Sequence, residues 1–99
     1  LLWKLGAEEA GESRRLRKEF EGALRTAELG VRLARPAGDS ELLAAALHAL
    51  AHTYWFSSRW NEALQAADEA ASLLRESSDT DLELRNLVLL AQAQDAVGG

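Results

Sequence analysis

The chain has 99 residues, a net charge of −5, 47% hydrophobic residues, 27% charged residues and no cysteine. These values are typical of one folded domain, and they exclude disordered chains, disulfide frameworks and thiolate metal sites. The acidic balance argues against general nucleic-acid binding, and no apolar run reaches the roughly 18 residues of a membrane span. We therefore expect a cytoplasmic domain without membrane contact, and, because the chain begins with Leu1, a fragment of a larger protein.

Alanine, leucine, glutamate and arginine dominate the sequence, and this composition favours helix throughout. Five helices are predicted, over residues 1–15, 19–35, 41–56, 59–76 and 80–97. In each of the central ones, apolar side chains recur at steps of three and four residues, which indicates one buried stripe. Five helices with short connections predict an all-α fold of antiparallel neighbours.

The predicted breaks between helices carry turn and capping residues. The sequence Pro36-Ala37-Gly38 ends the second helix, and Asp39-Ser40 is expected to supply the N-cap of the third. A tight turn is predicted at Ser57-Ser58. The only cluster of basic residues, within positions 14–18, is expected at a solvated turn between the first two helices. Contact with an acidic partner or with phosphates is the alternative for this cluster.

Sliding the sequence by 40 residues brings its two halves into register. The matches include Leu2 with Leu42, Ala23 with Ala63, Leu24 with Leu64, Ala27 with Ala67 and Leu33 with Leu73. A further shift places Leu82, Leu87, Leu90 and Ala91 on Leu42, Leu47, Leu50 and Ala51. The chain therefore contains about two and a half copies of one unit, at residues 1–38, 39–78 and 79–99.

The spacing within this unit resembles the tetratricopeptide repeat. The residues that carry the resemblance in the central copy are Leu47, Leu50, Ala51, Tyr54, Trp60, Ala63, Ala67 and Ala70. The long period is similar to the repeats of bacterial regulators and kinesin light chains, whereas the usual period is ~34 residues. The resemblance implies antiparallel helical hairpins stacked as a short right-handed α-solenoid. In that fold the first helix of each repeat lines a concave groove that binds a peptide or a partner helix.

The resemblance also implies which side chains line the groove. They are Glu8, Glu12, Arg15, His48, His52, Trp55, Arg85 and Gln92. We therefore predict a protein–protein interaction module of a regulatory, bacterial protein, with a protein or peptide as its partner. Trp55 is expected to be a binding hot spot, since the packing stripe already uses Tyr54 and Trp60. The other interpretation is that Trp55 packs under a neighbouring helix.

His48 and His52 are four residues apart, so they share one face of a helix. On the repeat register Glu8 and Glu12 are their counterparts, and stacked helices would bring all four side chains together as in a metal site. The sequence H-A-L-A-H lacks the glutamate of a zinc-protease motif, so we predict neither a metal, nor a cofactor, nor an enzyme. A small-ligand or metal-sensing domain built on these four residues is the alternative function.

The last predicted helix is apolar around much of its circumference, at Leu84, Leu87, Val88, Leu90 and Ala91. Repeat arrays normally cover such an end with a polar-faced helix. Three outcomes are open: the native chain continues, two copies pack end to end, or the helix is swapped between copies. For the 99-residue chain we expect homo-oligomers that form through this helix, with a two-fold interface as the default. A segment whose function is oligomerisation itself is a further alternative.

Overall fold

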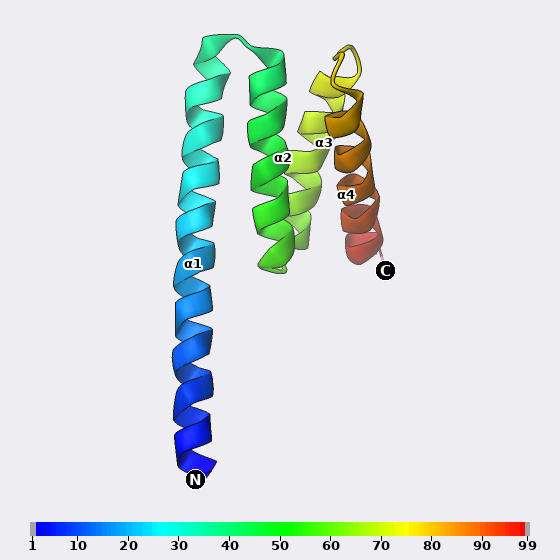
Figure 1. Cartoon of the computed structure of the whole chain (residues 1–99). Coiled ribbons are helices and arrows are strands. Elements are labelled where there is room, and N and C mark those ends of the chain that lie inside the picture. The colour runs from blue at the N-terminus through cyan, green and yellow to red at the C-terminus, as the bar shows by residue number, and fades with distance from the viewer. Residues whose placement is uncertain (1, 99) are drawn as a thin grey trace.

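The computed structural model describes the backbone of residues 2–98 and the side chains of residues 11–98. Its helices are α1 (Leu2–Ala37), α2 (Ser40–Phe56), α3 (Trp60–Leu74) and α4 (Thr80–Gly98). They run alternately up and down, and each packs beside the next along the chain (Figure 1). A smaller contact joins α2 to α4. The prediction of an all-helical fold is confirmed for the described residues.

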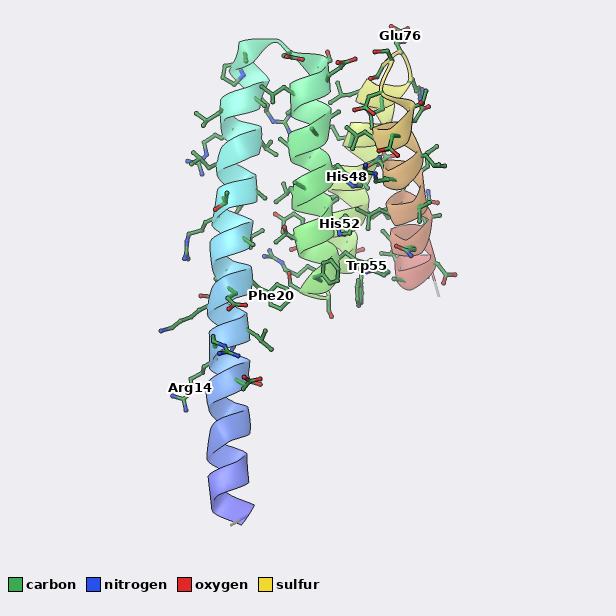
Figure 2. The ribbon with its side chains drawn as sticks, in the orientation of Figure 1. Arg14, Phe20, His48, His52, Trp55 and Glu76 are labelled. Atoms are coloured by element: carbon green, nitrogen blue, oxygen red, sulfur yellow. The ribbon has the colours of Figure 1, made fainter. Side chains whose placement is uncertain are left out.

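The prediction of five helices is wrong, because the helices expected over residues 1–15 and 19–35 are one continuous helix, α1. Residues 14–19 contain neither glycine nor proline, and arginine, leucine, lysine and glutamate are all strong helix formers. The basic cluster therefore lies along a helix and not at a turn. Phe20 lies level with the end of α2, and Arg14 lies beyond it (Figure 2). The first copy of the repeat thus does not fold as a hairpin.

The helices α2 and α4 begin at aspartate caps. The carboxylate of Asp39 accepts hydrogen bonds from the backbone N–H groups of Glu41 and Leu42, both at 3.1 Å. This satisfies two of the N–H groups that a helix start leaves without partners, and it confirms the predicted N-cap. At the start of α4 the carboxylate of Asp79 accepts one such hydrogen bond, from the N–H of Leu82 at 3.0 Å.

The α2–α3 turn contains a left-handed residue, Ser58, whose φ is +61°. The N–H of Ser58 donates to the carbonyl of Trp55 at 3.1 Å, and the N–H of Arg59 donates to the carbonyl of Tyr54 at 2.9 Å. These are the two hydrogen bonds of a Schellman cap. The left-handed position of this cap, here Ser58, is usually held by glycine. Gly38, with a φ of +72°, fills the corresponding place after α1.

The core lies between α2 and α3 and consists mostly of alanine. The alanines with no exposed surface in this hairpin are Ala44, Ala51, Ala63, Ala67 and Ala70. Small side chains let the two backbones approach closely, and Leu47 and Leu74 fill the remaining space. Among the described side chains of α1, only Val31 and Ala34 are buried. The hairpin of α2 and α3 is therefore the structural centre of the molecule.

Candidate interaction face on α2 and α4

A polar network joins α2, α3 and α4 at His48 and Asn86. Asn86 is fully buried, and its amide nitrogen donates to the carbonyl oxygen of Ala67 at 2.9 Å. Its amide oxygen lies 2.9 Å from Nδ1 of His48. Because that oxygen can only accept, the neutral His48 ring carries its proton on Nδ1 and leaves Nε2 as an acceptor. His48 thus acts first as a link between helices.

An aromatic column continues from His48 along the exposed side of α2. His52 lies edge-on to His48 with ring centroids 5.3 Å apart, and it stacks on Phe56 with centroids 5.5 Å apart. The three residues are spaced four apart, so they follow one face of the helix. Phe56 is 62% exposed, and the column therefore presents an aromatic surface to solvent. Figure 2 shows His48 and His52 one above the other on α2.

The pKa of His52 is lowered, first by partial burial and then by the positive charge that His48 can carry. Both effects disfavour the charged ring. His52 is therefore neutral at neutral pH, and its ring offers a hydrogen bond and an apolar face rather than a positive charge.

Trp55 is half-buried and packs on Trp60, with ring centroids 4.7 Å apart. It also lies against the core cluster between α2 and α3. The structure therefore favours the interpretation in which Trp55 serves packing. Phe56, its neighbour in the sequence, is the aromatic residue that the fold leaves exposed at the end of α2.

The other predicted groove residues fall into two separate groups. Arg85 and Gln92 are exposed on α4, at the repeat positions that correspond to Ala45 and His52 of α2, and Arg85 pairs with Asp81 on its own helix. Glu12 and Arg15 pair with each other at 2.5 Å on the part of α1 beyond Phe20. The side chain of Glu8 lies outside the described residues. The members on α2 and α4 therefore form the candidate face, and Glu12 and Arg15 lie apart from it.

The alternative metal site is not assembled in the described structure. Glu12 lies about 12 Å further along α1 than Phe20, at ~1.5 Å per residue, and so past the end of α2. Among residues 11–98, no three or more histidine, aspartate or glutamate side chains gather in a way that would hold a metal ion. Within the described helices, none is both long and apolar enough to cross a membrane.

Sequence reasoning missed Asn86, which has the most buried polar side chain among the described residues. A signal was present, because Asn86 stands between Leu82 and Leu89 on the apolar stripe of α4. A polar residue at such a position needs a hydrogen-bond partner inside the fold.

Comparison with known proteins identifies no relative, since the chain matches no family model, no curated protein and no solved structure. The resemblance to tetratricopeptide repeats therefore stays a prediction. The same holds for the regulatory, bacterial and cytoplasmic setting. The functional interpretation depends on the geometry of α2 and α4.

Proposed function

We propose that the chain is a protein-interaction module of the tetratricopeptide type, which holds a peptide or a partner helix on the face formed by α2 and α4. The observation that carries the proposal is the column of His48, His52 and Phe56. Each ring in the column contacts the next, so Phe56 is exposed but supported by the stacked ring of His52. A binding residue that is ordered in advance loses little conformational freedom when its partner arrives.

The chemistry of the face suggests what the partner offers. Phe56 provides a flat apolar contact, and the neutral His52 ring and Gln92 provide hydrogen-bonding groups. Ala45 and Ala49, which are exposed on α2, are small enough for another backbone to approach this helix closely. These features fit an apolar or aromatic anchor residue on the partner, flanked by polar groups, as in other helix or peptide grooves.

A library of random peptides displayed on phage provides the test, with the 99-residue chain as bait. We expect the selected peptides to share an apolar anchor and to bind the variant Phe56→Ala roughly tenfold or more weakly, since hot-spot aromatic rings contribute at least this much. His52→Ala is expected to weaken the same peptides. Leu16→Ala is the matched control, because Leu16 is 46% exposed but lies on α1.

The proposal fails if the selected peptides bind the Phe56→Ala and His52→Ala variants as tightly as the parent chain. It also fails if repeated selections give no peptide with a shared pattern. Circular dichroism of each variant shows whether the helices are intact, so that a loss of binding is not confused with unfolding.

A further inference from the structure

The two outermost helices each leave apolar side chains exposed on the side that faces away from the α2–α3 hairpin. On α4, Leu84 is 63% exposed, Leu87 47% and Val88 52%. On α1, Leu29 is 48% exposed and Leu33 is 65% exposed. The 40-residue register indicates which kind of neighbour each of these faces fits.

The exposed face of α4 corresponds to the face of α2 that α3 covers. Residues 84, 87 and 91 stand at the repeat positions of Ala44, Leu47 and Ala51. In α2 these three residues have 0, 2 and 0% exposure, because α3 packs against them. The α4 face therefore fits a helix like α3, running antiparallel to α4.

The exposed face of α1 corresponds to the face with which α3 covers α2. Residues 23, 26 and 33 stand at the repeat positions of Ala63, Ala66 and Leu73. In α3, Ala63 and Ala66 are buried and Leu73 packs against the core, and Ala66 lines a hollow together with Leu47 of α2. In α1 the counterparts are all exposed. The molecule thus shows one half of a helix pair at each of its two sides.

We propose that α4 of one copy packs against α1 of a second copy, so that two chains together re-form the pair that α2 and α3 make within one chain. The helices alternate in direction, so α1 of a second copy in the same orientation runs antiparallel to α4, as α3 does to α2 (Figure 1). Each copy contributes two different faces. The association is therefore head to tail and not two-fold.

A second correspondence supports the same arrangement. Within the chain, α2 and α4 meet through the hydrogen bond between His48 and Asn86. In the proposed arrangement α4 of one copy takes the place of α2, and α2 of the next copy takes the place of α4. Val88 of the first copy then stands where His48 stands within the chain, and Ala46 of the next copy stands where Asn86 stands. Both members of the hydrogen-bonded pair are thus replaced by apolar residues. The contact between the two copies therefore buries no polar side chain without a partner at these positions.

The distribution of charge favours α1 over a second α4 as the partner of α4. Residues 20–37, the part of α1 that lies level with α2, contain three arginines and two glutamates, a net charge of +1 (Figure 2). Residues 80–98 contain three acidic side chains and one arginine, a net charge of −2. Two copies of α4 would repel each other, whereas α4 and α1 attract each other, and salt weakens this attraction.

Two variants that each block one face test the proposal. Leu33→Glu blocks α1 and Leu84→Glu blocks α4, and both leucines are largely exposed, so both variants should fold. An unpaired carboxylate in an apolar contact is expected to weaken association by roughly 100-fold or more. Sedimentation velocity should show that the parent chain grows past two copies as its concentration rises, whereas each variant alone stays at 10.8 kDa.

The decisive sample is an equimolar mixture of the two variants. Leu33→Glu keeps its α4 face and Leu84→Glu keeps its α1 face, so the mixture should form a dimer that contains one chain of each kind. If α4 instead packs on α4 of a second copy, Leu33→Glu associates like the parent chain and the mixture forms no mixed dimer. That result would show that the proposal is wrong. A parent chain that stays monomeric at millimolar concentration also overturns it.

Phe56→Glu is the matched control, since Phe56 is as exposed as the two leucines but lies on the face proposed for peptide binding. Phe56→Glu should associate like the parent chain but no longer bind the peptides selected from the library. Leu84→Glu should show the reverse. Self-association and peptide binding can therefore fail independently of each other.

Discussion

The structure predicts that Asn86 holds α4 in place, and the substitution Asn86→Ala tests this. Asn86 has no exposed surface, donates to the carbonyl of Ala67 and accepts from His48. The substitution removes both hydrogen bonds and leaves a small void between three helices.

The size of the effect follows from the state of each partner after the substitution. The carbonyl of Ala67 lies within α3 and keeps its helical hydrogen bond, and the half-buried His48 can turn toward water, so neither is left wholly unpaired. Two net hydrogen bonds contribute about 1 kcal/mol each. The void adds up to ~1 kcal/mol. We expect a total loss of about 2–3 kcal/mol in the free energy of unfolding, and about 4–8 °C in melting temperature for each kcal/mol at this chain length.

Urea unfolding followed by circular dichroism measures this loss, at a protein concentration low enough to keep the chain monomeric. Asn61→Ala, at an exposed position of α3, is the matched control and should change stability by less than about 0.5 kcal/mol. A double-mutant cycle with His48→Ala should give a coupling energy of about 1 kcal/mol. A loss below about 0.5 kcal/mol for Asn86→Ala, or no coupling to His48, would refute the reasoning.

Two further predictions concern the helix ends and the effect of pH. Gly38 and Ser58 both have positive φ, a conformation that glycine adopts more readily than other residues. In urea unfolding, Gly38→Ala should therefore destabilise the chain by about 1 kcal/mol, and Ser58→Gly should stabilise it by a similar amount. Changes of the same sign in the two variants would contradict this. The pKa of His52 is lower in the folded chain than its ordinary value of 6.5, so the unfolded chain binds more protons in the window below 6.5. Stability should therefore be complete above that value and fall as the pH drops through it. Urea midpoints at about pH 7.5 and 5.5 should differ less for His52→Gln than for the parent chain, and equal differences would show that His52 is not responsible.

The parts of the fold that were predicted correctly are those with local signals. The Asp39 cap, the Ser57-Ser58 turn and the stripes of α2 and α3 are each encoded within a few residues. The break expected between residues 15 and 19 has no support from a local residue. Helix propensity decides the outcome there, because nothing in residues 14–19 interrupts a helix.

The candidate site was only partly predictable, because its contacts join residues far apart in the chain. The spacing of His48 and His52 gave their shared face, but the contact of His48 with Asn86 spans 38 residues. The repeat register carried Glu12 to the same surface on the assumption that the first copy folds as a hairpin. Since α1 is one continuous helix, the first copy is not a hairpin, and Glu12 lies past the end of α2.

The straight course of α1 and the proposed self-association follow from one feature of the sequence. In the central copy, α2 folds against α3 and covers Ala63 and Ala66. A helix folded back over α1 would cover the corresponding residues, Ala23 and Thr26, in the same way. Because α1 has no break, Ala23 and Thr26 stay exposed, and in the proposed self-association a helix of the α2 kind from a second copy covers them. Among the described helices, α4 corresponds to α2 and has its equivalent face exposed, so the unbroken course of α1 and the exposed face of α4 support the same proposal.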